Sequence, residues 1–278
     1  MRFIVKKFEI SNFRNFRNIE FVLGNRITVI SGQNGVGKSN LLSLISSGSG
    51  VTKKSILGSN FQPEFYDFFN IDSQEKFKEY QLFLYYNNEN DENILVKRLS
   101  FKDDSSRDRG IRVIPRTTNH GSSQSMSVKE TAINIKNKYN VGGAARVPIP
   151  TIYLSLSRLY PLGEKKELVS IKKFNKKHKL YQIGIDEKFK KWYNSVIPNT
   201  IGERDELSVI KKKTSVRSSF HMDMKNTPAL SQSIGQDNIG NIISALIDIF
   251  ILSQDESYNG ALLCIDEIEV SLHPDTQL

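Results

Sequence analysis

Residues 27–39 read Ile-Thr-Val-Ile-Ser-Gly-Gln-Asn-Gly-Val-Gly-Lys-Ser, and this stretch decides the fold. The β-branched run 27–30 predicts a buried parallel strand, and the apolar positions within 40–46 predict a helix that faces a sheet. Between them, residues 32–39 match G-x-x-x-x-G-K-[ST], a glycine-rich loop that joins a strand to a helix. The order of these elements predicts an α/β fold built around a phosphate-binding loop (P-loop).

The residue types of this loop suit a nucleoside triphosphate with Mg²⁺. Glycines let backbone amides curl around phosphates, and a helix N-terminus adds partial positive charge. We expect Lys38 to bridge the β and γ phosphates and the Ser39 hydroxyl to ligate Mg²⁺. A glycine-rich turn that merely ends in Lys-Ser is the alternative. The predicted ligands are ATP and Mg²⁺, and the predicted binding residues are Gly32, Gln33, Asn34, Gly35, Val36, Gly37, Lys38, Ser39 and Asn40.

A second apolar run, residues 261–265, ends in two carboxylates. Ligands of open α/β sheets bind at the carboxyl ends of strands. Asp266 is therefore expected to hold Mg²⁺, and Glu267 is the candidate general base that polarises the attacking water. Two plain turn residues in solvent are the alternative. Cys264, the single cysteine, is expected to be a buried hydrophobe without a further role.

Residues 233–236 read Ser-Ile-Gly-Gln and directly precede a segment, 237–252, whose apolar residues recur at three- and four-residue spacing. This spacing predicts the clearest helix of the chain. Ser233 is a suitable N-cap for that helix. Strands are expected at 2–8, 19–23, 80–86, 93–101 and 151–156, the third and fourth as an antiparallel hairpin. Residues 103–127 are expected to be exposed and partly mobile around a short apolar segment at 111–114.

The order of these elements resembles that of ABC-type ATPases, and the opening residues 8–16 and the segment 265–274 are similar to the SMC, RecF and OLD branch of that class. The resemblance covers roughly 1–46 and 228–278, about a third of the chain. It implies an AAA family ATPase with an ABC-ATPase-like head: a mixed sheet with an antiparallel β layer. It also implies that a signature turn, Ser233, Gly235 and Gln236, contacts the γ-phosphate bound by a second subunit. Gln232 and Ile234 depart from the leucine and first glycine of the family signature.

The same resemblance suggests roles for three further residues. Arg14 would approach the nucleotide phosphates, unless it is a surface arginine in a turn. His273, followed by Pro274, would shape the D-loop. Arg158 follows the strand 151–156 and either senses nucleotide or pairs with an acidic neighbour, and the sequence does not separate these two readings.

Charge is concentrated in one segment of the chain. The net charge is +9, and residues 165–213 hold fourteen Lys/Arg against six Asp/Glu, a local charge of +8. This basic segment also contains Phe189, Trp192 and Tyr193 in an amphipathic pattern. It suits contact with a DNA backbone, or it is a solvated helical surface with its aromatic residues in a local core. We expect an ATPase head at 1–162 and 216–278, with an inserted, mainly helical basic lobe at 163–215.

The resemblance implies a dimeric ATPase in which two heads enclose nucleotide and couple its hydrolysis to DNA-related work, either repair or prokaryotic defence of the OLD-like or PtuA-like kind. The chain stops twelve residues after Asp266, whereas heads of the resembling class normally continue through another strand, so a C-terminal truncation is expected, with control of a nuclease partner or of a nuclease domain in the missing part. The alternative is a slowly hydrolysing, ATP-dependent scaffold or switch. No apolar run approaches the roughly 20 residues that cross a bilayer, so a cytoplasmic protein is expected. The ATPase subunit of a membrane transporter is disfavoured because the opening residues 8–16 resemble the SMC-like branch.

Overall fold

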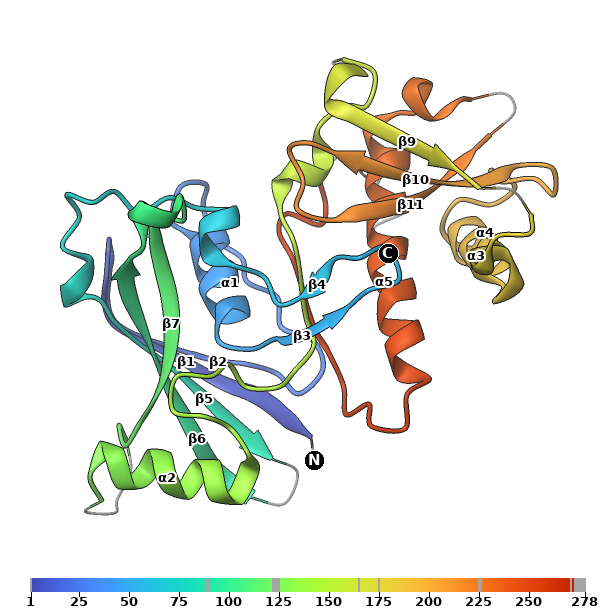
Figure 1. The fold of residues 1–278 in the computed structure, drawn as a ribbon. Coiled ribbons are helices and arrows are strands. Elements are labelled where there is room, and N and C mark those ends of the chain that lie inside the picture. Colours follow the sequence, from blue (N-terminus) through green and yellow to red (C-terminus); the bar gives the residue numbers. More distant parts are fainter. Residues whose placement is uncertain are drawn as a thin grey trace. The chain divides into compact units, whose positions relative to one another are not determined.

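The computed structural model describes residues 2–88, 91–121, 126–164, 166–174, 176–224, 227–270 and 272 (Figure 1). The chain divides into two compact units, each built from three stretches of sequence. Unit 1 comprises Met1–Thr52, Phe61–Tyr153 and Asn259–Cys264, and unit 2 comprises Lys53–Asn60, Leu154–Tyr258 and Ile265–Leu278.

Unit 1 is built on a five-stranded antiparallel sheet in the order β2-β1-β5-β6-β7. Side chains of β1 and β5 alternate between buried and more exposed positions, as expected for a sheet with one covered face. The predicted opening strands and the predicted hairpin are confirmed. The strands are β1 (Phe3–Phe13), β2 (Phe16–Val22), β5 (Gln81–Asn88), β6 (Asp91–Asp103) and β7 (Ile111–Thr118).

Two helices belong to unit 1. The predicted helix after the P-loop is α1 (Lys38–Ser47), which buries Leu41, Leu44 and Ile45 against the apolar core. The second, α2 (Val128–Tyr139), begins with a capping box between Ser127 and Glu130. The sequence analysis did not predict α2, although this Ser-x-x-Glu signal was present. The apolar segment expected at 111–114 lies in β7, and residues 105–109 are exposed as expected, but β7 continues to Thr118 and buries Thr117, so less of 103–127 is exposed than predicted.

Unit 2 contains a three-stranded antiparallel sheet, β11-β10-β9, and the long helix α5 (Ile234–Ser253), which packs on β11 (Figure 1). The helix predicted at 237–252 is therefore confirmed. Ser244 of α5 accepts a hydrogen bond from the Phe220 amide at 2.7 Å, which fixes helix and strand together. The other elements are β9 (Val169–Lys173), α3 (Lys179–Gln182), α4 (Ile185–Val196), β10 (Glu206–Lys212) and β11 (Ser218–Asp223).

The segment 163–215 is not mainly helical, because it supplies β9 and β10 as well as α3 and α4. Its apolar residues join a core shared with β11 and α5, including Phe189, Tyr193 and Leu207. The division into three sequence segments stays a prediction.

Two short strand pairs complete the chain. In the first, β8 (Thr151–Leu154) pairs with β12 (Leu262–Ile265), which confirms both predicted strands. The Leu262 amide donates to the Pro150 carbonyl at 2.8 Å and the Asp266 amide to the Leu154 carbonyl at 3.0 Å. Since both hydrogen bonds follow the same order along the two strands, the pair is parallel. In the second pair, β3 (Val51–Lys54) lies beside β4 (Asn60–Phe61). Short 3₁₀ helices connect the larger elements: η1 (Phe65–Asp67), η2 (Phe77–Glu79), η3 (Ser105–Arg107), η4 (Leu156–Leu159), η5 (Lys166–Leu168) and η6 (Ala229–Ser231).

The strand predicted at 27–30 was wrong. Residues 27–30 form no strand, and Ile27 and Val29 are each 83% exposed. β-branched residues favour extended backbone, but a buried parallel strand also needs partner strands beside it. None of the strands that the structure describes pairs with this segment; Ile27 and Val29 face solvent, and Ile30 packs against the core of unit 1. In the described part of the chain, no helix combines the length and the apolar character needed to cross a membrane.

Candidate functional site

The P-loop lies in unit 1, and its last two residues, Lys38 and Ser39, are the first two residues of α1. Gly35 and Gly37 have φ values of 80° and 98°, in the left-handed region that favours glycine. A Cβ on Gly37 would lie 2.8 Å from the ring of Phe16. The second glycine of the motif is therefore required both by backbone conformation and by the close approach of an aromatic ring.

Lys38 folds back across this loop. Its Nζ atom donates hydrogen bonds to the carbonyl oxygens of Gly32 and Gln33, at 2.8 and 3.0 Å. The ammonium group thus lies over the loop that the motif assigns to phosphate binding. The loop-to-helix half of the predicted context is confirmed, whereas the strand half is not.

The first turn of α1 has the chemistry of an anion site. Gly37 occupies the N-cap and has no side chain that could accept a hydrogen bond from the following amides. A bound phosphate would supply the acceptor that a capping side chain supplies in other helices. The residues present therefore fit a triphosphate ligand, and the Ser39 hydroxyl at the second helical position is of the oxygen type that Mg²⁺ prefers.

Arg14 lies in the β1–β2 turn with φ of 47°. Its guanidinium group forms an ion pair with Glu75 at 3.0 Å and donates to the Asn70 carbonyl at 2.8 Å. Burial raises the pKa of Glu75, but hydrogen bonds from Arg14 and Tyr80 outweigh this effect and bring it to about 2. Contact between Arg14 and a phosphate stays a prediction, and it would require Arg14 to leave Glu75.

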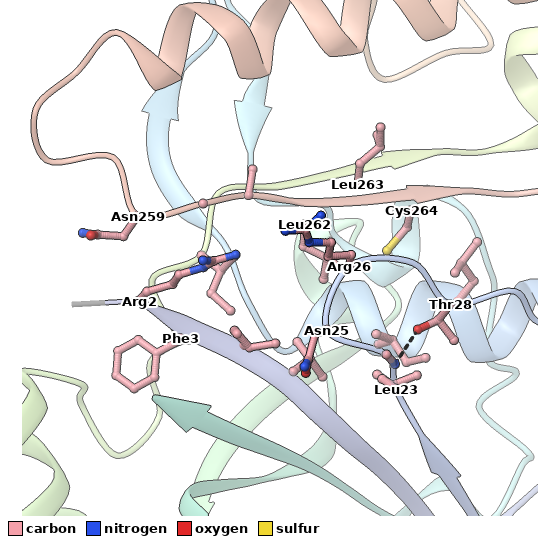
Figure 2. A pocket seen from close by; sticks show the side chains of 18 of the residues that line it. Arg2, Phe3, Leu23, Asn25, Arg26, Thr28, Asn259, Leu262, Leu263 and Cys264 are labelled. Atoms are coloured by element: carbon pink, nitrogen blue, oxygen red, sulfur yellow. Dashed lines mark hydrogen bonds between the residues drawn. The ribbon is translucent and has the colours of Figure 1, made fainter. Parts of the chain in front are cut away.

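Unit 1 contains a cavity of about 180 Å³ (Figure 2). It is lined by the start of β1, by residues 23–26, 28 and 30, by part of α1 and by the segment 259–264. No residue of the P-loop motif lines it, so this cavity is not the phosphate site. Cys264 is among its lining residues and is 4% exposed. Burial raises the pKa of its thiol to about 12. The prediction that Cys264 is a buried hydrophobe is confirmed.

The two carboxylates predicted to act on Mg²⁺ and water follow β12, in unit 2. Asp266 is 5% exposed. Glu267 has φ of 47°, a left-handed conformation that costs a non-glycine residue about 1 kcal/mol. The Glu267 carbonyl accepts a hydrogen bond from the Val270 amide at 3.2 Å, so residues 267–270 form a tight turn. The candidate base therefore opens a turn whose backbone is strained at its first residue.

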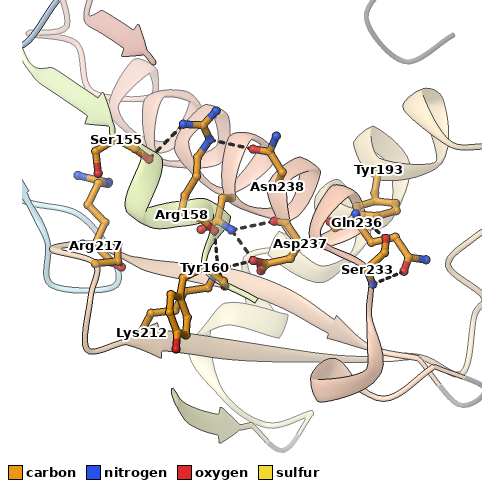
Figure 3. A network of polar contacts seen from close by, with 12 residues as sticks. Ser155, Arg158, Tyr160, Tyr193, Lys212, Arg217, Ser233, Gln236, Asp237 and Asn238 are labelled. Atoms are coloured by element: carbon orange, nitrogen blue, oxygen red, sulfur yellow. Dashed lines mark hydrogen bonds and ion pairs between the residues drawn. The ribbon is translucent and has the colours of Figure 1, made fainter. Parts of the chain in front are cut away.

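Arg158, at η4, contacts this turn and the start of α5, and Figure 3 shows its contacts with Ser155 and Asn238. Its side chain is buried, and Nη2 donates to the Glu267 carbonyl at 2.9 Å. Its Nε atom donates to Oδ1 of Asn238 at 2.8 Å, and Nη1 donates to the Ser155 carbonyl at 3.1 Å. Between the two readings that the sequence left open, these contacts favour neither, because they reach an amide and main-chain carbonyls.

The predicted signature turn caps α5. The Ser233 hydroxyl accepts a hydrogen bond from the Gln236 amide at 3.2 Å, and Gln236 Oε1 accepts one from the Ser233 amide at 3.0 Å. This is a complete capping box, so Ser233 is the N-cap that the sequence allowed. Tyr193 of α4 donates to the Gln236 carbonyl at 3.2 Å (Figure 3). Contact of Ser233, Gly235 and Gln236 with a second subunit stays a prediction.

The residues that sequence reasoning missed lie just after this cap. Lys212 forms a buried ion pair with Asp237 and also donates to the carbonyls of Arg158 and Tyr160. Asn238 is fully buried. The available signal was the pair Asp237 and Asn238, two polar residues within the apolar stripe of a predicted helix, where a buried polar group needs a partner.

The basic segment keeps most of its aromatic residues inside. Phe189 and Tyr193 are 1% and 2% exposed, and the Trp192 ring packs edge-on against Phe250 at 6.0 Å. Phe189 and Tyr193 are thus core residues of unit 2 and not a platform for bases. Lysines remain exposed on the same segment at Lys166, Lys172, Lys173, Lys176, Lys177, Lys179, Lys191 and Lys213. Lys165 and His273 lie outside the described residues.

Comparison with known families places the chain in a described domain family. A family model described as an AAA domain matches residues 7–269, nearly the whole chain. No curated protein matches the chain. The match supports ATP binding and ATPase activity and does not separate one branch of such ATPases from another.

Proposed function

Since the chain belongs to the AAA domain family, we propose that it binds Mg-ATP through residues 32–40 and hydrolyses it, with Asp266 as a Mg²⁺ ligand and Glu267 as the general base. The observation that supports this most directly is the P-loop itself. Two left-handed glycines, an uncapped start of α1 and the Lys38 ammonium over the loop carbonyls together suit a triphosphate.

The proposed base follows the apolar strand β12. Asp266, which is buried, comes directly after this strand, and Glu267 is the next residue. A carboxylate at that place can orient water for attack on a γ-phosphate, while the ammonium of Lys38 offsets the charge that develops on the phosphoryl oxygens. Lys38 and Glu267 are the proposed catalytic residues.

The proposal extends to a homodimer in which Ser233, Gly235 and Gln236 of one subunit complete the P-loop of the other. In support, Ser233 is exposed although it caps α5, so a partner can reach its hydroxyl. ATP would then close the dimer and hydrolysis would open it.

The test is phosphate release by the unaltered chain, by Lys38→Met and by Glu267→Gln, together with ATP binding by each. We expect Lys38→Met to lose binding and Glu267→Gln to keep binding but lose hydrolysis by a factor of about 10² or more. Equal, near-zero rates with intact binding would leave the second candidate, an ATP-dependent scaffold or switch, in place of the enzyme.

The proposed DNA-related role rests on the positive charge of the basic segment. Eight exposed lysines of the basic segment suit phosphate contact without base stacking, which predicts binding that weakens steeply with salt. Charge reversal at Lys176 and Lys177 should weaken DNA binding, whereas the same change at Lys129 and Lys136, exposed on α2, should not. Equal effects of the two pairs would contradict a specific surface. A nuclease partner, and a choice between repair and defence, belong to the same proposal.

A further inference from the structure

The turn at Glu267 and the start of α5 are joined by a buried pair of side chains, Arg158 and Asn238 (Figure 3). They are 2% and 0% exposed, and Arg158 Nε donates to Asn238 Oδ1 at 2.8 Å. Neither residue bears the chemistry of hydrolysis. The pair lies between two candidate functional segments, the turn that begins at Glu267 and the N-terminus of α5.

Each member of the pair holds one end of the turn 267–270. Arg158 Nη2 donates to the Glu267 carbonyl at 2.9 Å, and Asn238 Nδ2 donates to the Val270 carbonyl at 3.0 Å. The first and last carbonyls of the turn are thus bound to two side chains that are bound to each other. Because Glu267 has a left-handed φ, its conformation persists only if the surroundings fix it.

The pair is itself fixed to the start of α5. Asn238 follows Asp237, whose carboxylate pairs with Lys212, and Lys212 also donates to the Arg158 carbonyl. The capping box of Ser233 and Gln236 lies one turn earlier on the same helix. A shift of the α5 N-terminus would therefore be transmitted to the backbone of Glu267 through two hydrogen bonds.

We propose that Arg158 and Asn238 form a clamp that positions Glu267 and ties its position to the Ser233 turn. Both are positioning residues, since they reach the reaction through the Glu267 backbone. The inference rests on the proposed function and deepens it. Contact of a second subunit with Ser233 would change the position of Glu267 through this clamp.

The first test is the turnover number of Arg158→Lys and Asn238→Ala. Lysine cannot reproduce the three-way fork of Arg158, and alanine removes both hydrogen bonds of Asn238. Displacing a catalytic group by about 1 Å can cost about 100-fold in rate, so we expect kcat to fall by about 10- to 100-fold. Binding of ATP should be nearly unchanged, because the P-loop belongs to unit 1.

The matched control is Arg217→Lys. The Arg217 side chain is 13% exposed and contacts α5 through Asp248, and its guanidinium group also donates to the Asn60 carbonyl at 3.1 Å. It should lose stability without losing kcat. Clamp variants that fold and turn over as fast as Arg217→Lys, while Glu267→Gln is inactive, would overturn the clamp.

A double variant distinguishes a loss of Glu267 positioning from a loss of activity that does not involve Glu267. If Arg158 acts through Glu267, Arg158→Lys should lower the residual rate of Glu267→Gln by no more than about twofold, since effects of residues acting as a unit are not additive. A full 10- to 100-fold loss in that background would contradict the inference. If instead Glu267→Gln hydrolyses ATP like the unaltered chain, the proposed function fails.

Hydrogen exchange tests the clamp without a measurement of ATP hydrolysis. It can be applied to either clamp variant that folds. The Val270 amide, which donates to Glu267, should exchange faster in Arg158→Lys or Asn238→Ala than in Arg217→Lys. Unchanged exchange across 267–270 would overturn the clamp whatever the rates are.

Discussion

Lys97 and Thr117 lie directly opposite each other on β6 and β7, and Lys97 Nζ donates to Thr117 Oγ1 at 2.9 Å. Nζ also donates to the Gly142 carbonyl at 2.9 Å. The lysine is fully buried, and both of these acceptors are neutral. Burial lowers the pKa of Lys97 to about 8 from its ordinary 10.5. Because the amine of Lys97 binds its proton less tightly in the folded chain than in the unfolded chain, the stability of the fold depends on pH.

The first prediction concerns that dependence. A folded-state pKa below the unfolded value means that the charged amine opposes folding below pH 8, and that the penalty disappears as the pH rises toward 10.5. Relative to Lys97→Met, the unaltered chain should gain up to about 3 kcal/mol over this interval. Urea unfolding of both chains between pH 7 and 10 measures it. Lys136→Met, at an exposed site on α2, is the control, and a pH-independent gap for Lys97→Met would contradict the prediction.

The second prediction separates strain from collision in the P-loop. Gly35 has φ of 80° and open space where a Cβ would lie, so Gly35→Ala costs only the left-handed conformation, about 1 kcal/mol. Gly37→Ala adds the collision with Phe16 at 2.8 Å. Titration with a fluorescent ATP analogue should therefore show a larger loss for Gly37→Ala.

Removing the ring provides the control for this comparison. In a Phe16→Ala background the collision is absent, so the difference between Gly37→Ala and Gly35→Ala should shrink. If Gly37→Ala binds no worse than Gly35→Ala in the unaltered chain, Phe16 does not shape the loop.

Local signals in the sequence predicted helices and hairpins well. The helix α5 followed from apolar spacing, α1 from the apolar positions within 40–46, and the β5–β6 hairpin from two apolar runs and a turn. Each of these elements is stabilised mainly by residues close in sequence, or by one face that the pattern reveals. The match to an AAA domain confirmed the family at this coarser level.

Long-range relationships were beyond the same reasoning. Residues 27–30 have the composition of a buried strand, but composition does not specify which strand pairs with them. The clamp joins Arg158 to Asn238 and Glu267, which are 80 and 109 residues away in the chain, so no spacing rule connects them. For the site as a whole, motifs identified residue types, and the side chains that position them became visible only in three dimensions.

The third prediction uses the buried pair Arg217 and Asp248. Burial raises the pKa of Asp248 to about 6, an effect that Arg217 partly offsets. For a carboxyl group whose folded-state pKa exceeds the unfolded 3.8, stability is fully present below pH 3.8 and is lost as the pH rises through 6. Arg217→Met should deepen this loss, by about 3 kcal/mol or more at pH 8 and by much less at pH 5.

Urea unfolding at the two pH values measures this effect. The double variant Arg217→Met with Asp248→Leu removes both charges and should recover most of the loss. A loss of equal size at both pH values would contradict a carboxylate left unpaired in the folded state.

The fourth prediction separates the two roles of Ser233. Aspartate is as good an N-cap as serine, so Ser233→Asp should change the free energy of unfolding by less than about 0.5 kcal/mol. Its negative charge would repel the γ-phosphate of a partner subunit, so ATP-dependent dimerisation should be lost. Light scattering on the Glu267→Gln background with ATP measures the dimer. Ser127→Asp is the matched control, because Ser127 is an exposed N-cap with the same capping box on α2. A dimer that forms equally well in both variants would reduce Ser233 to a helix cap and remove the support for a signature acting between subunits.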